Sequence, residues 1–203
     1  MQMSTPIPQQ ELQIWKLLTD VKVVVDVGAR TDTDIVTIFP GAEVYMFEPN
    51  PVFYQELVEK TKQYRGVTVN NFGLGNISAE VAYNDTYQCV DISKQYWLGE
   101  SRKVRIERLE DYVKNAKVTR IDFLKIDAEG CDCDVLRGAG HLIPSIKYIQ
   151  AEHSDDIEEI KAVVGDNFEM IDVGFRNLLF INKLLVKNIS NLIDSIKKLC
   201  TPL

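Results

Sequence analysis

The sequence predicts an α/β protein whose mostly parallel sheet is covered by helices on both faces. Amphipathic helical segments alternate with strand-like segments along the chain, an order typical of parallel sheets. The first strand-like segment, VKVVVDV (21–27), is a continuous apolar run with no polar alternation, as expected for a strand buried on both faces. A late pair of strands joined by a tight turn, within FEMIDVGFRNLLFINK (168–183), predicts an antiparallel hairpin at the sheet edge.

The first part of the chain divides into three helix–strand units. Apolar residues recur at helical spacing in ELQIWKLLTD, and Asn50 followed by Pro51 is a capping residue and a helix start. The expected elements, in order, are a helix over 9–20, the strand 21–27, a short helix over 34–39, a strand over 43–48, a helix over 51–63, and a strand with its exit loop over 66–75.

The second part continues the alternation after an irregular interruption. The stretch 85–101 has no clear period, so we interpret it as a candidate substrate lid. Its Tyr87, Tyr96 and Trp97 are suited to stack on a sugar ring or to form a hydrophobic plug. The other expected elements are an outlying strand over 80–84, a helix within 104–115, a strand over 121–127, a helix over 131–140, a strand over 146–154, a helix over 155–164, the hairpin, and a terminal helix over 188–200.

Length and composition favour one cytoplasmic domain over residues 1–203, with its core over 21–183. The net charge of −7 argues against a nucleic-acid partner. No apolar run approaches the roughly 18 residues of a membrane span. The N-terminus lacks the pattern of a signal peptide, and the four cysteines do not suggest a disulfide framework.

The ends of four predicted strands carry the candidate binding residues. In a parallel sheet, ligands bind beyond the carboxyl ends of the strands. Gly28 allows a tight turn after the first strand, and Glu48 ends the second strand at a spacing from Asp26 that suits a ribose-binding carboxylate. NNFGLG (70–75) is placed to flank an adenine, and KIDAEG (125–130) ends the fourth strand. Together these segments predict an adenosine-containing cofactor.

The loop after Gly28 distinguishes between cofactors. A dinucleotide site would continue with two more glycines, whereas this chain has Arg30 and then Thr31 to Asp34, with two carboxylates. Two like charges 4 Å apart repel by about 4 kcal/mol at an effective dielectric of about 20, which disfavours a pyrophosphate. S-adenosylmethionine carries a sulfonium and an ammonium and no phosphate, so the loop favours this methyl donor over NAD.

With these segments assembled, the sequence resembles the FkbM family of S-adenosylmethionine-dependent methyltransferases. The resemblance extends from about residue 21 to 183 and is strongest in IDFLKIDAEGCDCDVLRGA (121–139). It is supported by VVVDVGA, VYMFEPNP, NFGLGN and GFRNLLFINK in the same order. It implies a Rossmann-like class I methyltransferase fold with a seven-stranded sheet whose last strand is antiparallel. It also implies methyl transfer to an oxygen, often on a sugar or another small molecule.

The resemblance also implies a set of cofactor-binding residues. Glu48 would hold the ribose, and Asp32 stands where the family usually has glycine. From its place beside the methionine end, Arg30 could pair with either the cofactor carboxylate or Asp32. The first-strand residues would lie at the methionine end, and the third-strand residues near the adenine. The implied set is Asp26, Gly28, Ala29, Arg30, Asp32, Glu48, Pro49, Asn71, Phe72, Gly73, Leu74 and Asp127.

A hydroxyl acceptor must lose its proton during methyl transfer, so a base or a metal ion is expected near the methyl group. The candidates are Asp127, Glu129 and His153, with Lys125 just inside the strand. Asp127, Glu129 and Glu152 are also an oxygen-ligand set for a divalent cation such as Mg²⁺.

Other interpretations of these residues remain open. Asp127 and Glu129 would also suit the start of the following helix, Lys125 an ion pair with a neighbouring acid, and Asp132 and Asp134 the first helical turn. For the whole chain, the alternatives to an enzyme acting on a small-molecule or sugar acceptor are a catalytically inactive binding subunit and, less favoured, a nicotinamide-dependent oxidoreductase.

Overall fold

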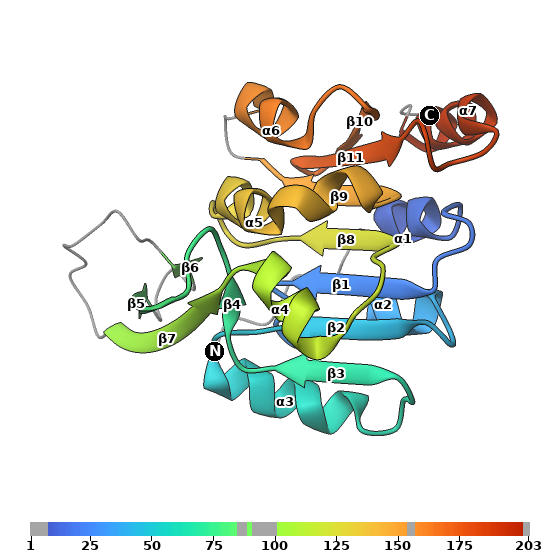
Figure 1. Cartoon of the computed structure of the whole chain (residues 1–203). Helices are drawn as coiled ribbons and strands as arrows, with labels where there is room; N and C mark the ends of the chain where they lie inside the picture. The colour runs from blue at the N-terminus through green and yellow to red at the C-terminus, as the bar shows by residue number, and fades with distance from the viewer. Residues whose placement is uncertain (1–7, 85–88, 91–100, 154–156, 201–203) are drawn as a thin grey trace.

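The computed structural model describes residues 8–84, 89–90, 101–153 and 157–200. Its centre is a seven-stranded sheet in the order β10-β11-β9-β8-β1-β2-β3 (Figure 1). Neighbouring strands from β9 to β3 pair in parallel, and β11 pairs antiparallel with both β9 and β10. The predicted Rossmann-like fold and its antiparallel edge hairpin are therefore confirmed.

The strands of this sheet agree with the predicted ones in order and type. Continuous apolar runs form the central strands because helices cover both of their faces. The strands are β1 (Val23–Val27), β2 (Glu43–Phe47), β3 (Val67–Asn70), β8 (Phe123–Ile126), β9 (Tyr148–Glu152), β10 (Phe168–Gly174) and β11 (Asn177–Asn182).

Two apolar cores lie on opposite faces of the sheet. One core packs α4, α5 and α6 against the sheet, and the other packs α1, α2, α3 and α7. Asn50 caps α3 as predicted, because its Oδ1 accepts a hydrogen bond of 2.9 Å from the amide of Val52. The helices are α1 (Gln9–Trp15), α2 (Asp34–Ile38), α3 (Pro51–Thr61), α4 (Leu109–Ala116), α5 (Asp132–Ala139), α6 (Ile157–Val164) and α7 (Ile189–Cys200), with a 3-10 turn, η1 (Gly140–Ser145).

A second, smaller sheet stands beside the carboxyl ends of the central strands (Figure 1). Its order is β4-β7-β5-β6. The predicted outlying strand is β5, and its main partner β7 falls in a segment that we expected to lead into a helix. The strands are β4 (Gly73–Leu74), β5 (Ala79–Asn84), β6 (Cys89–Val90) and β7 (Ser101–Glu107).

Two features differ from the predicted elements, and one prediction lies outside the described residues. The N-terminal helix ends at Trp15 instead of residue 20, and η1 was not predicted. The helix predicted within 104–115 is α4, which begins at Leu109 after β7. Most of the proposed lid, including Tyr87, Tyr96 and Trp97, lies outside the described residues.

Candidate active site

A pocket opens at the carboxyl ends of β1, β2 and β8, where the sequence placed a ligand. One wall comes from the loops that follow these three strands, and the other from α3 and the small sheet. Its lining residues are Val27, Gly28, Arg30, Glu48, Pro49, Phe53, Gly73, Leu74, Tyr83, Ile106, Asp127, Ala128, Glu129 and Cys131.

Glu48 is the most constrained acid of the pocket. Its side chain is buried, yet both carboxylate oxygens accept backbone hydrogen bonds: Oε2 from Arg30 at 2.9 Å and Oε1 from Asn50 at 2.7 Å. Burial raises the pKa of the Glu48 carboxyl to about 7 despite these bonds. The carboxylate thus joins the loop after β1 to the end of β2 and keeps one orientation toward the pocket.

Gly28 shapes the turn after β1 through a backbone contact. Its φ is +76°, and a Cβ atom at this position would lie 1.9 Å from the carbonyl oxygen of Asp127. The amide of Gly28 donates to the carbonyl of Phe47 at 3.0 Å. Glycine is therefore required here because the loops after β1 and β8 touch each other, a reason separate from any ligand contact.

Lys125 is a buried cation shared by two acids behind the pocket. Its Nζ lies 3.2 Å from Asp26 Oδ1 and 3.7 Å from Asp127 Oδ2. Burial alone would lower the pKa of Lys125, but the carboxylates of Asp26 and Asp127 raise it above its ordinary value. The expected ion pair is present, and Lys125 itself does not line the pocket. The two carboxylates therefore favour the protonated form of Lys125.

Two charged residues of the pocket have left-handed backbone conformations. Arg30 has φ +47° and Glu129 has φ +49°, values that are uncommon outside glycine and often found at functional sites. The Arg30 guanidinium stacks over the ring of Phe53, with its carbon 5.2 Å from the ring centroid. Burial, and then the neighbouring charge of Asp127, raises the pKa of the Glu129 carboxyl.

Asp132 connects two strand ends, a role that the sequence did not reveal. The structure places it in the first turn of α5, as expected, but its carboxylate is buried and turned toward the sheet. Oδ1 accepts from the amide of Glu152 at 2.9 Å and Oδ2 from the amide of Ala128 at 3.3 Å. Burial raises the pKa of Asp132 to about 7. The side chain ties the loop after β8 to the end of β9.

Of the predicted cofactor residues, Gly28, Arg30, Glu48, Pro49, Gly73, Leu74 and Asp127 line the pocket, and five do not. Ala29 and Asp26 are buried beside it. Phe72 packs in the core, where its ring stacks edge-on against Phe47. Asn71 donates to the carbonyls of Glu48 and Pro49 at 3.0 and 3.2 Å, which fastens the end of β3 to the end of β2.

Asp32 is also absent from the residues that line the pocket. Its Oδ1 accepts a hydrogen bond of 2.7 Å from the amide of Asp34, so the carboxylate belongs to the loop before α2. Within the described residues Arg30 makes no ion pair with Asp32. The expected repulsion of a pyrophosphate by Asp32 and Asp34 therefore has no support in the pocket geometry.

Glu152 and His153 end β9 beside the pocket without lining it. Glu152 Oε1 lies 3.5 Å from a guanidinium nitrogen of Arg176, in the turn between β10 and β11. The Nδ1 of His153 is buried and without a hydrogen-bond partner among the described residues.

The expectation of a Mg²⁺ site is not supported. Across the described parts of the chain, no group of three or more His, Cys, Asp or Glu side chains is arranged to hold a metal ion. Asp127, Glu129 and Glu152 were the predicted ligands. They lie at the carboxyl ends of β8 and β9, at the same edge of the sheet. Their side chains have different partners, because Asp127 pairs with Lys125 and Glu152 with Arg176.

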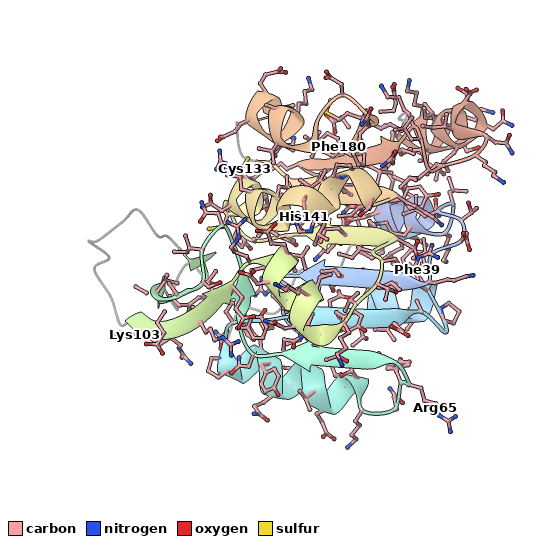
Figure 2. All side chains as sticks on the ribbon, in the orientation of Figure 1. Phe39, Arg65, Lys103, Cys133, His141 and Phe180 are labelled. Atoms are coloured by element: carbon pink, nitrogen blue, oxygen red, sulfur yellow. The ribbon has the colours of Figure 1, made fainter. Side chains whose placement is uncertain are left out.

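Figure 2 labels His141 of η1 and Cys133 of α5. His141 is mostly exposed and its Nδ1 lies 2.9 Å from Glu110 Oε2, in agreement with a surface position. Cys131 and Cys133 lie at the N-cap and in the first turn of α5, and neither takes part in a disulfide. None of the helices in the described ranges combines the length and the hydropathy that a membrane span requires.

Part of the apolar lining was not predicted from the sequence. Phe53 comes from α3, Tyr83 from β5 and Ile106 from β7. The alternating pattern of EVAYN predicted a strand, but no local signal showed that this strand would cover the ligand site. Cys131, at the start of α5, completes the lining beside Ala128.

Comparison with known proteins places this site in a family. The sequence profile described as "Methyltransferase FkbM domain" matches residues 26–181. The hexuronic acid methyltransferase AglP of Haloferax volcanii is 23% identical over 128 residues, which cover 63% of this chain and 54% of AglP. The chain therefore spans about half the length of this relative.

Two solved structures support the fold. The methyltransferase FkbM of Methylobacillus flagellatus superposes with a TM-score of 0.60 at 16% identity, over 82% of this chain and 47% of that one. An rRNA methylase of Streptococcus thermophilus superposes with a TM-score of 0.52 at 11% identity, over 89% and 99% of the two chains. With the profile covering most of the sequence, the chain belongs to the FkbM methyltransferase family.

Proposed function

We propose that this protein transfers a methyl group from S-adenosylmethionine to a hydroxyl oxygen of a small molecule or sugar. The observation that carries the proposal is the buried Glu48 carboxylate, fixed by two backbone amides at the end of β2 and turned into the pocket. A carboxylate in this place is suited to accept hydrogen bonds from both hydroxyls of a ribose. Membership of a methyltransferase family agrees with this function.

The charges around the pocket fit a cationic ligand. Asp127, Glu48 and Glu129 all line it, and Arg30 is the basic residue among the lining residues. Burial raises the pKa of both Glu48 and Glu129, so a positive charge brought close to them would favour their ionised forms. S-adenosylmethionine carries such charges, and a dinucleotide carries two negative phosphates instead.

The remaining lining suits an adenosine group. Pro49, Gly73 and Leu74 form a surface beside Glu48, with Ile106 behind Gly73. In the proposed complex these residues contact the adenine and Glu48 holds the ribose. Gly28 and Asp127 lie at the methionine end, with Asp26 and Ala29 supporting them from behind.

Bound S-adenosylmethionine would supply an electrophilic methyl group, and the chain's own residues would position the acceptor and take its proton. Glu129 is the proposed base, because it lines the pocket and burial raises its pKa toward the range useful for proton transfer. Asp127 is held by Lys125 and is proposed to orient the ligand. His153 does not line the pocket, and we assign it no step in the transfer.

The acceptor is proposed to be a small hydroxylated compound. The similarity to a protein named as a hexuronic acid methyltransferase supports a sugar, at 23% identity. The apolar side chains of Phe53 and Ile106 and the ring of Tyr83 offer a surface for the flat face of such a molecule.

The test is isothermal titration of the purified protein with S-adenosylmethionine and, separately, with NAD. We expect micromolar binding of the methyl donor and none of NAD. Glu48→Gln should weaken binding by at least about tenfold, because a charged acceptor of ribose hydroxyls is lost. The matched control is Glu43→Gln, at the opposite end of β2 and outside the pocket.

Two results would contradict the proposal. Tight binding of NAD would favour an oxidoreductase. Failure of a folded protein to bind either compound would favour the alternative of a binding subunit without methyltransferase activity.

A further inference from the structure

Arg30 is a cation of the pocket wall without an ion pair. Among the described residues no carboxylate lies within ion-pair distance of its guanidinium, and its Nε is buried without a hydrogen-bond partner. The neighbouring cations differ in this respect: Lys125 pairs with Asp26 and Asp127, and Arg176 with Glu152. A buried guanidinium hydrogen is costly to leave unsatisfied, so a partner from outside the chain is the simplest account of its position.

The backbone and side chain of Arg30 serve separate purposes. The amide donates to Glu48 Oε2 at 2.9 Å and so helps to orient the ribose-binding carboxylate. The side chain stacks over Phe53 of α3, with its guanidinium carbon 5.2 Å from the ring centroid, and both residues line the pocket. Stacking holds the guanidinium flat and leaves its N–H edge free for a planar, bidentate anion such as a carboxylate.

We propose that Arg30 binds an anionic group, a carboxylate or phosphate, of the methyl acceptor. This proposal rests on the proposed methyltransferase function and narrows its substrate class to acidic acceptors. The other source of such an anion is the carboxylate of the methyl donor. In the proposed complex the donor's methionine end lies beside Asp26 and Asp127, where Lys125 is the cation, whereas the Arg30 guanidinium packs on Phe53 of α3.

Arg30→Asn is the variant that isolates the guanidinium. The φ of +47° at this position suits asparagine better than arginine, so the change removes the charge without straining the loop, and the amide bond to Glu48 is kept. Arg176→Asn is the matched control. Arg176 also has a left-handed backbone, with φ +63°, but it lies outside the pocket lining and pairs with Glu152.

The first measurement separates the two sources of the anion. S-adenosylhomocysteine carries the donor's carboxylate, and 5′-methylthioadenosine lacks it. We expect Arg30→Asn to change the affinity for both by less than about twofold, as Arg176→Asn does. A loss of about tenfold for S-adenosylhomocysteine alone would show that Arg30 holds the donor, and would overturn the proposal.

The second measurement tests the acceptor with D-glucuronate and D-glucose, which differ by a carboxylate in place of a hydroxymethyl group. Binding is followed by NMR titration in the presence of saturating S-adenosylhomocysteine. We expect the wild type and Arg176→Asn to prefer glucuronate by about tenfold, and Arg30→Asn to lose that preference. Equal binding of the two sugars by the wild type would overturn the acidic-acceptor proposal, although the methyl-donor site would stand. If the wild type binds neither S-adenosylhomocysteine nor 5′-methylthioadenosine, the proposed function is overturned as well.

Discussion

Lys125 Nζ lies 3.2 Å from Asp26 Oδ1, and both side chains are buried between the same two strands. The pair exists because β1 and β8 are adjacent and in a register that sets Asp26 opposite Lys125. A buried ion pair contributes little to net stability, but losing one partner leaves the other charge buried and unpaired. The pair therefore fixes the ends of the two strands that carry the pocket.

Replacing Lys125 by methionine should destabilise the protein by about 3–5 kcal/mol, because Asp26 loses its counter-charge. Urea denaturation of the variant measures the change in the free energy of unfolding. Lys161→Met is the control: it removes an exposed ion pair with Glu158, 2.7 Å long, and should cost less than about 1 kcal/mol. Adding Asp26→Asn to Lys125→Met should recover part of the loss. If the double variant is no more stable than the single one, the unpaired charge is not the cause.

Gly28→Ala should prevent correct packing of the loops after β1 and β8. The new Cβ would lie 1.9 Å from the Asp127 carbonyl oxygen, and the φ of +76° adds strain. We expect a loss above about 3 kcal/mol, or insoluble protein. Gly41→Ala is the matched control, because Gly41 has φ +85° with no atom within 4 Å of the added Cβ. It should cost about 1 kcal/mol, from backbone strain alone. Thermal denaturation compares the two variants. An equal loss of stability in both would mean that the contact with the Asp127 carbonyl is unimportant.

Asp132→Ala should destabilise the chain more than Asp134→Ala, although the two acids share the first turn of α5. The Asp132 carboxylate is buried and accepts the amides of Ala128 and Glu152, so its loss leaves both donors unsatisfied. The expected cost is about 1–3 kcal/mol per unsatisfied group. Asp134 is partly exposed, pairs with Arg137 at 3.1 Å and accepts one hydrogen bond of 2.8 Å from Asn76 Nδ2, so its loss should cost about 1 kcal/mol. Chemical denaturation of both variants at the same pH measures the loss in the free energy of unfolding for each.

The free energy of unfolding should fall as the pH rises from 5 to 8. Burial raises the pKa of Glu48 from 4.5 to about 7, so the folded state holds a proton that the unfolded state releases. The stability from this group is complete below the unfolded pKa and is lost as the pH rises through about 7. The loss is about 3 kcal/mol at most.

Glu48→Gln should make this pH dependence shallower, and combining it with Asp132→Asn should flatten it further, because burial also raises the pKa of Asp132 to about 7. Denaturation curves at four pH values provide the slopes. A wild-type stability that is constant or increasing over this range would contradict the burial of both carboxyl groups.

Binding of S-adenosylmethionine should strengthen as the pH rises through about 7, because ionised Glu48 is the better acceptor for ribose hydroxyls and the better partner for a cation. Titration calorimetry at pH 6 and pH 8 measures the change. In Glu48→Gln the remaining binding should depend less on pH. An affinity that falls with pH in the wild type would exclude Glu48 as the controlling group.

The sequence by itself determined the order of strands and helices and the edge at which the site lies. Continuous apolar runs and helical periodicity are local properties, and parallel strands place residues such as Glu48 and Asp127 at one common edge. The helix start at Asn50 and Pro51 was also predictable, because capping depends on neighbouring residues in the sequence. β7 was missed because its sequence, SRKVRIE, has a high proportion of charged residues and no continuous apolar run.

Only the tertiary structure decided which side chains meet at that edge. Asp132 is a first-turn acid of α5, as predicted, but its carboxylate also joins two strand ends. Asp32 was predicted to bind the cofactor and instead accepts an amide in its own loop. Phe53 and Tyr83 reach the ligand site from elements whose sequences carry no sign of it. Such contacts depend on strand register and on the packing of segments far apart in the chain, and neither is encoded in a local pattern of residues.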